Sequence, residues 1–161
     1  MARPHGATPA MKALDSAGVE YRVHEYEHDQ RSTSFGLEAA AALGVPASRV
    51  FKTLLASDGT ALVVGIVPVD KTLDLKALAT HVKVKRLVMA DPAVAERSTG
   101  MVVGGISPVG QKRLLPTVID ESAMGQERVL VSGGRRGLDV ELSPQDLVRL
   151  TRAVVGSIAA G

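Results

Sequence analysis

The chain has 161 residues, of which 45% are hydrophobic, enough for one core of ordinary size but not for two. Its formal net charge of +2 permits a polyanionic partner without requiring one. The absence of cysteine excludes disulfides, thiolate zinc sites and a cysteine nucleophile supplied by the protein. With no signal-peptide pattern and no apolar run of the ~20 residues that span a membrane, we expect a cytoplasmic single domain over residues 1–161, with residues 1–7 as a flexible tail.

Helix starts are marked three times by a side-chain oxygen that can cap free N–H groups, followed by a proline. These starts are Thr8-Pro9, Asp91-Pro92 and Ser143-Pro144. The first helix is predicted over residues 9–17, and the last one is expected to carry an apolar face made of Leu147, Leu150, Val154 and Val155. Two further helices are predicted, over residues 37–43 before Gly44 and over residues 75–81 after Asp74 as a cap.

Strands are predicted where polar and apolar residues alternate or where short apolar runs occur. Residues 20–26 alternate, and a polar loop is expected over residues 31–35. The runs 50–56 and 61–67, joined by Ser57-Asp58-Gly59-Thr60, form the clearest hairpin. Shorter strands are predicted at residues 86–89, 117–119, 129–131 and 138–142, whereas residues 100–110 are too glycine-rich for a packed element. The sum is a mixed α/β fold in which antiparallel pairing dominates.

Eight short motifs follow one another in order along most of the chain. They are Thr-Pro-Ala (8–10), Tyr-Glu-His-Asp (26–29), Phe-Lys-Thr-Leu-Leu (51–55), Leu-Asp-Leu-Lys (73–76), Ala-Asp-Pro (90–92), Arg-Ser-Thr-Gly (97–100), Gly-Gly-Ile-Ser-Pro (104–108) and Ser-Gly-Gly-Arg-Arg-Gly-Leu-Asp (132–139). As a set they resemble the YbaK family of editing domains, which is related to the insertion domain of bacterial prolyl-tRNA synthetase. Within that family the set is most similar to the Cys-tRNA(Pro) deacylases.

The resemblance implies a curved, mixed, mostly antiparallel sheet flanked by helices. It also implies hydrolysis of the ester that joins an amino acid to the 3′ end of tRNA, without a metal or an organic cofactor. The chain has no Gly-x-Ser-x-Gly elbow, and its four histidines suggest no Ser-His-Asp triad. His24 and His28 lack a third ligand, so we predict no metal site. The family instead implies substrate assistance, in which the cysteine thiol attacks its own ester carbonyl; good intramolecular geometry can be worth roughly 7 to 11 kcal/mol of barrier.

Lys52 is the first predicted catalytic residue, because it interrupts the otherwise apolar run 50–55. A cation that points inward there must be paired or must serve a ligand. Its expected role is to hold the terminal phosphate or hydroxyl region of the tRNA. Alternatively, Lys52 faces solvent on the polar side of a half-buried strand.

Gly104, Gly105 and Asp139 complete the predicted catalytic set. The two glycines would let backbone N–H groups approach a developing oxyanion, unless they form a plain turn. Asp139 would bind the amino group of the substrate or orient Lys52 through an ion pair, unless it is only a turn residue. The predicted substrate-binding residues are Tyr26, Phe35, Thr53, Ile106, Ser107, Pro108, Ser132 and Gly134, of which Tyr26 and Phe35 could instead belong to the core.

The expected partner is the 3′ acceptor end of an aminoacyl-tRNA, with prolyl-tRNA synthetase as a possible second one. Basic residues around 83–86, 112–113 and 135–136 could guide the acceptor stem or could be ordinary solvated charges. Two alternatives to a Cys-tRNA(Pro) deacylase stay open. One is an editing enzyme for alanine or serine, and the other is a non-catalytic tRNA-binding module that acts with the synthetase.

Overall fold

The computed structural model describes residues 7–161, so the tail predicted for residues 1–7 lies outside the described residues except for Ala7. The helices are α1 (Pro9–Ser16), α2 (Phe35–Leu43), α3 (Leu75–Val82), α4 (Pro92–Thr99) and α5 (Pro144–Thr151), with short 3-10 turns η1 (Ala47–Arg49) and η2 (Glu121–Gly125). The strands are β1 (Arg22–Glu25), β2 (Phe51–Ser57), β3 (Leu62–Pro68), β4 (Thr72–Leu73), β5 (Val88–Met89), β6 (Thr117–Asp120), β7 (Val129–Arg135), β8 (Leu138–Leu142), β9 (Val154–Gly156) and β10 (Ala159–Ala160).

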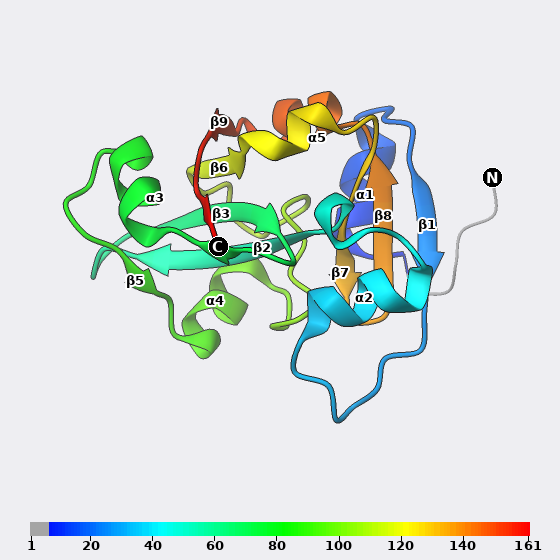
Figure 1. Ribbon diagram of the computed structural model, residues 1–161. Helices are drawn as coiled ribbons and strands as arrows, with labels where there is room; N and C mark the ends of the chain where they lie inside the picture. The colour runs from blue at the N-terminus through cyan, green and yellow to red at the C-terminus, as the bar shows by residue number, and fades with distance from the viewer. Residues whose placement is uncertain (1–6) are drawn as a thin grey trace.

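The predicted mixed α/β class is confirmed, and backbone hydrogen bonds divide the described strands into three sheets. The largest has the order β5-β2-β3-β6-β9, the second has the order β1-β8-β7, and β10 pairs with β4. Antiparallel pairing dominates as expected, although β6 runs parallel to both β3 and β9. The two larger sheets stand at a steep angle to each other in Figure 1, and an isolated parallel bridge between Val50 and Leu130 joins them.

The main core joins the two larger sheets to α1 and α5. Ile66 and Ile119 from the first sheet pack with Val131 and Val140 from the second, and Leu147 contributes from α5. All five are buried, so this apolar surface is the chief source of stability. The remaining faces are covered separately, by α3 on the five-stranded sheet and by α2 on the three-stranded one.

The three predicted helix starts are confirmed by their caps. Thr8 accepts a hydrogen bond from the Met11 N–H, Asp91 from the Ala93 N–H, and Ser143 from the Asp146 N–H. Each replaces a bond that the first turn of a helix cannot make within itself. The hairpin of β2 and β3 and the cap of α3 by Asp74 are confirmed as well.

The predicted loop over residues 31–35 is wrong at its end, because α2 begins at Phe35 rather than at Leu37. Because glycine has a low helix propensity, Gly36 argued against a helix that begins before residue 37. Its place in the helix follows from packing: a Cβ atom at Gly36 would collide with the side chain of Val69. The glycine thus lets the first turn of α2 approach the end of β3 closely.

The apolar face predicted for the last helix is wrong in its second half. The chain leaves α5 at Arg152, which adopts a left-handed conformation with φ +55°, and Val154 and Val155 lie in β9. Arginine is not a typical helix-ending residue, so the sequence carries no glycine signal here. The strands β4, β9 and β10 were not predicted, since each is only two or three residues long.

Asp120 at the end of β6 holds this C-terminal segment. The side chain is buried, and its Oδ1 accepts hydrogen bonds of 3.0 Å from the N–H groups of both Ile158 and Ala159. Its Oδ2 accepts from the Ser122 backbone and hydroxyl. Burial alone would raise the pKa of Asp120, but these hydrogen bonds outweigh it and the net pKa is lowered.

We therefore expect Asp120→Asn to destabilise the fold by about 2 to 4 kcal/mol at neutral pH, because an amide cannot replace all four accepted bonds. A carboxylate with a lowered folded pKa contributes stability above its unfolded pKa and loses it as the pH falls, so the difference should shrink below about pH 4. Urea unfolding at both pH values measures this. The control is Asp58→Asn at an exposed turn, where a single oxygen accepts both backbone hydrogen bonds and an amide oxygen can keep them, so its effect should be much smaller. Equal losses in both variants would contradict the role of Asp120.

Candidate active site

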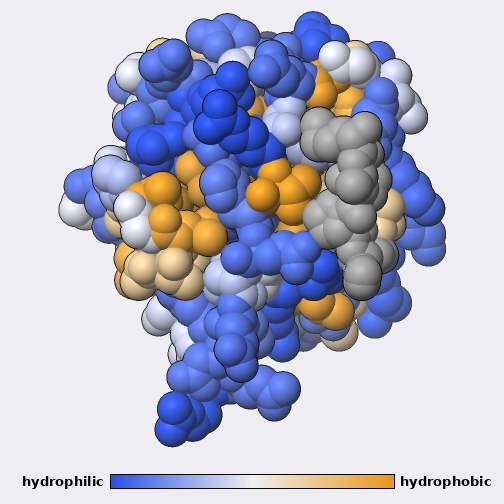
Figure 2. Space-filling view, turned by 90° about the vertical axis from the view of Figure 1, so that its right-hand side faces the viewer, coloured by the Kyte–Doolittle hydropathy of each residue, from blue (hydrophilic) through white to orange (hydrophobic). Residues whose placement is uncertain are grey.

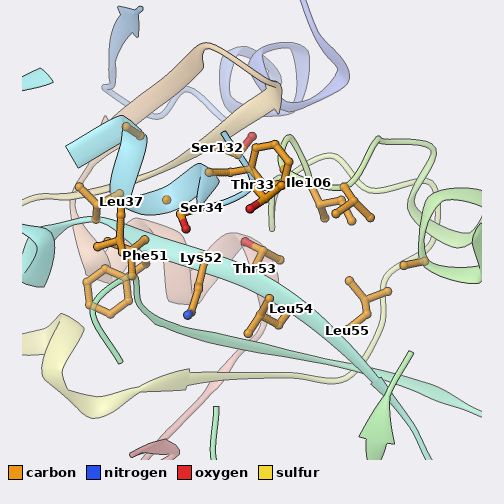
Figure 3. Close-up of a pocket in the computed structure, with 18 of the residues that line it drawn as sticks. Thr33, Ser34, Leu37, Phe51, Lys52, Thr53, Leu54, Leu55, Ile106 and Ser132 are labelled. Atoms are coloured by element: carbon orange, nitrogen blue, oxygen red, sulfur yellow. The ribbon is translucent and has the colours of Figure 1, made fainter. Parts of the chain in front are cut away.

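A pocket of about 660 Å³ opens beside β2, where the two larger sheets diverge. Its volume lies in the range of small-molecule sites. Strand β2 pairs with β3 along its whole length but with β5 only at Ala56 and Ser57, so its other edge is open over the preceding residues. The pocket extends past this open edge, and side chains from both faces of β2 line it (Figure 3).

The pairing of strands explains how distant residues meet here. The parallel bridge between Val50 and Leu130 sets the start of β2 beside β7, so Lys52 and Ser132, each two residues further on, reach the same pocket, although the Lys52 side chain points away from Ser132 (Figure 3). Ser132 is in turn the cross-strand partner of Asp139 on β8. Lys52, Ser132 and Asp139 thus come from three different strands and line one pocket.

Lys52 is half-buried in the pocket wall and has no ion-pair partner among residues 7–161. Burial lowers the pKa of Lys52, and the negative charge of Asp70 opposes that shift only in part. Figure 3 shows that Lys52 and Thr53 leave β2 on opposite sides, with Thr53 directed toward Ser132. The Thr53 hydroxyl is buried without a hydrogen-bond partner in the described structure, which marks it as a contact available to a ligand after a small adjustment.

Asp139 is the second charged group of the pocket, and only 4% of its surface is exposed. Burial raises its pKa to about 7, and no hydrogen bond or ion pair to its carboxyl group exists among the described residues. In particular, Asp139 forms no ion pair with Lys52, so each group is available to a bound ligand. Tyr26 lines the pocket nearby, and burial followed by the charge of Asp139 raises the pKa of its phenol to about 12.

Gly104 and Gly105, in the loop between α4 and β6, have different surroundings. Gly104 lines the pocket with φ +88°, and a Cβ atom there would lie 2.7 Å from the ring of Phe35. Gly105 instead packs against the backbone of the turn between β7 and β8, and its N–H donates to the Val102 carbonyl. The Gly105 N–H is therefore occupied in this conformation, whereas the described residues provide no acceptor for the N–H of Gly104 or Ile106.

Of the predicted substrate-binding residues, Tyr26, Phe35, Thr53, Ile106 and Ser132 line the pocket, and three others do not. Ser107 is fully buried, and its hydroxyl accepts a hydrogen bond from the Val109 N–H. Pro108 is buried in the same loop. Gly134 lies in the irregular part of β7 with φ +105°, packed against Thr8. These three therefore lie outside the pocket lining.

Several lining residues escaped the sequence-based prediction. Met89 and Ala90 line the pocket from β5 and the residue that follows it, and Pro92 joins them from the start of α4. The Ala-Asp-Pro motif, which includes two of them, was the available signal. Thr33 and Ser34 lie at the other side, at the end of the β1–α2 connection; its middle part projects from the molecule as a hydrophilic protrusion in Figure 2.

The described residues 7–161 contain no group of three or more histidine, aspartate or glutamate side chains arranged to hold a metal ion. Within the same range, no helix has the length and apolar character needed to cross a membrane.

Comparison with known proteins identifies a family whose domain includes most of the pocket. The model of the family described as "Aminoacyl-tRNA editing domain" matches residues 31–150, which include all of the pocket residues named above except Tyr26. The chain belongs to this family. The resemblance inferred from the eight motifs is thereby confirmed, and so is the class of function that it implied, aminoacyl-tRNA editing by a hydrolase.

Full-length relatives of this editing domain cover most of the chain. A protein of Enterococcus faecalis, named as a candidate Cys-tRNA(Pro)/Cys-tRNA(Cys) deacylase, EbsC, is 34% identical and covers 94% of this chain and 92% of its own. The Ser/Thr-tRNA deacylase ProXp-y of Escherichia coli is 25% identical, covering 86% and 84%. A crystal structure described as a candidate trans-editing enzyme for prolyl-tRNA synthetase superposes with a TM-score of 0.86 at 27% identity, covering 99% and 100%.

Proposed function

We propose that this protein is a trans-editing deacylase that hydrolyses the ester of mischarged Cys-tRNA(Pro) in the cytoplasm. Membership of the editing family supports the reaction, and the 34% identity to a relative named for Cys-tRNA(Pro) and Cys-tRNA(Cys) supports the substrate. The acceptor 3′ end of the tRNA is the bound element. Prolyl-tRNA synthetase is the proposed partner, because a structural neighbour that covers 99% of this chain carries that synthetase in its description.

The single observation that carries this proposal is a pocket with an unpaired lysine and an unpaired buried carboxyl group but without a histidine in its lining. Ser132 is the lining serine on β7, and its Oγ accepts a hydrogen bond from the Gly134 N–H with no imidazole beside it. A serine without a base is a weak nucleophile. The site is therefore built to bind and orient a substrate that brings its own nucleophile.

The thiol of an esterified cysteine is such a nucleophile. Its sulfur forms a bond to the ester carbonyl carbon, the bond from that carbon to the ribose oxygen breaks, and the thiol proton ends on the ribose oxygen. The products are free tRNA and a cyclic thioester that water opens. Holding the thiol and the carbonyl at reacting distance is the task of the pocket, and this kind of positioning can supply roughly 7 to 11 kcal/mol.

The pocket residues have distinct roles in this proposal. Lys52 holds the hydroxyl region of the terminal ribose beside the ester, and the Asp139 carboxylate binds the α-ammonium of the amino acid. The free N–H groups of Gly104 and Ile106 face the carbonyl oxygen as it becomes negative. Phe51 and Leu55 contribute apolar surface to the same cavity, which suits a small side chain such as that of cysteine.

A deacylation panel tests the function directly. We expect Cys-tRNA(Pro) to be hydrolysed at least roughly a hundredfold faster than Ala-tRNA(Pro) and Ser-tRNA(Pro), since only the thiol can supply the nucleophile. Cys-tRNA(Cys) in the same panel measures whether the tRNA body is recognised. Equal hydrolysis rates for Ala-tRNA(Pro) or Ser-tRNA(Pro) would replace the proposal by an editing enzyme of other amino-acid specificity. The similarity to the Ser/Thr-tRNA deacylase ProXp-y supports this alternative. Binding without turnover at micromolar enzyme would indicate a non-catalytic module.

A further inference from the structure

Arg136, in the turn between β7 and β8, is held at the rim of the pocket by two contacts. Its Nε donates a hydrogen bond of 2.8 Å to the Val103 carbonyl, and its guanidinium lies 4.7 Å from the centre of the Phe35 ring. Val103 and Phe35 both line the pocket. The side chain is exposed, so its other nitrogens face the solvent just outside the cavity.

The segments that hold Arg136 are themselves fixed. The Val103 N–H donates to the Glu96 carboxylate on α4 at 2.8 Å. A Cβ atom at Gly105 would lie 2.7 Å from the backbone of Arg135 and Arg136, so loop and turn are in direct contact. The guanidinium is thus preoriented, and little conformational entropy remains to be lost when it binds a ligand.

Two guanidinium nitrogens of Arg136 remain without an acceptor. No hydrogen bond from Nη1 or Nη2 and no ion pair of Arg136 exists within residues 7–161, whereas the neighbouring Arg135 reaches Glu25 at 3.9 Å. A fixed guanidinium with two free nitrogens matches the oxygens of a phosphate group in a bidentate arrangement. Lysine deeper in the pocket cannot form that arrangement, because its ammonium is a point charge.

Resting on the proposed function, we propose that Arg136 forms a phosphate-binding subsite at the pocket mouth, which takes the 5′-phosphate of the terminal adenosine. The aminoacyl ester then enters the cavity, and Lys52 is left to the ribose and the ester. A phosphate contact of this kind positions the substrate without selecting a sequence. Arg136 also braces Phe35 and Val103, so its test must separate the two effects.

Two small substrates make that separation: the cysteinyl ester of adenosine 5′-monophosphate and the cysteinyl ester of adenosine. We expect the wild-type protein to prefer the first by about tenfold in kcat/KM, the value of one charge-assisted contact of about 1.4 kcal/mol. Arg136→Gln should abolish this preference. Lys52→Ala and the matched control Arg135→Gln should leave the ratio intact, whatever they do to the rates. An equal loss on both substrates in Arg136→Gln would reduce the residue to a brace and overturn the proposal.

A binding measurement decides the matter without turnover. In ¹⁵N-labelled protein, the Arg136 Nε–H resonance, assigned by its absence in Arg136→Lys, should shift on titration with adenosine 5′-monophosphate and not with adenosine. No shift with the monophosphate would overturn the subsite even if esters are hydrolysed. A shift in a protein that hydrolyses neither these esters nor Cys-tRNA(Pro) would support the subsite while removing the proposed deacylase function.

Discussion

Replacing Lys52 by alanine is expected to lower kcat/KM for Cys-tRNA(Pro) by roughly a hundredfold, the usual effect of losing one charged contact that stabilises a transition state. The folded state should not suffer, because Lys52 has no ion-pair partner in the described structure and burial disfavours its charge. Thermal unfolding should thus be nearly unchanged while deacylation falls. Steady-state rates and melting temperatures of the same preparations measure both effects.

The control for Lys52 is Lys76→Ala, which removes the same charge from an exposed site on α3. It should leave the rate within about twofold of the wild type, since exposed charges contribute little. Lys52→Arg adds a second comparison, because it retains charge but changes shape. A near-normal rate in Lys52→Ala would remove Lys52 from the active site and with it the proposed arrangement of the ester.

Asp139→Asn is expected to stabilise the protein at high pH while weakening substrate binding. Burial raises the folded pKa of Asp139 to about 7 from its ordinary value of 3.8. Folding therefore keeps a proton on this group over that range, and the stability that the neutral form allows is lost as the pH rises through about 7. At about pH 8.5 the asparagine variant should exceed the wild type by up to roughly 4 kcal/mol, and at about pH 4 by little.

The kinetic counterpart separates a site role of Asp139 from a structural one. If its carboxylate binds the α-ammonium, Asp139→Asn raises KM for Cys-tRNA(Pro) by about tenfold or more, as expected for a lost charge-assisted hydrogen bond. Asp58→Asn, a change at an exposed carboxylate in the turn between β2 and β3, serves as the charge-matched control. A variant that is less stable than the wild type at every pH, with unchanged KM, would show that Asp139 is needed for packing and not for the ligand.

Local signals predicted much of the fold, because the determinants lie within a few residues. Thr8, Asp91 and Ser143 each cap the helix that follows, and Gly44 adopts the left-handed conformation expected at the end of α2. The signals failed where tertiary packing decided. Gly36 sits in a helix because it faces Val69, and α5 ends at a left-handed arginine that no composition rule marks.

The candidate site was predicted through family motifs more than through residue chemistry. Lys52, Gly104 and Asp139 were selected by their motifs, and they line one pocket as expected. The sequence could not show which contacts the glycine and serine residues of the loop before β6 make. Gly105 contacts another turn and has its N–H bonded, and Ser107 directs its hydroxyl into its own loop. Such details depend on contacts between segments far apart along the chain, which no motif records.

The Val50–Leu130 bridge carries a consequence for how the specificity of this protein can change. The cavity lies where two sheets meet, and this bridge together with the core packed between the sheets fixes how far apart they stand. Substitutions in that core would alter the width available to the amino acid without changing any group that touches it. A search for variants that accept a different amino acid should therefore include residues flanking the bridge, not only those that face the ligand.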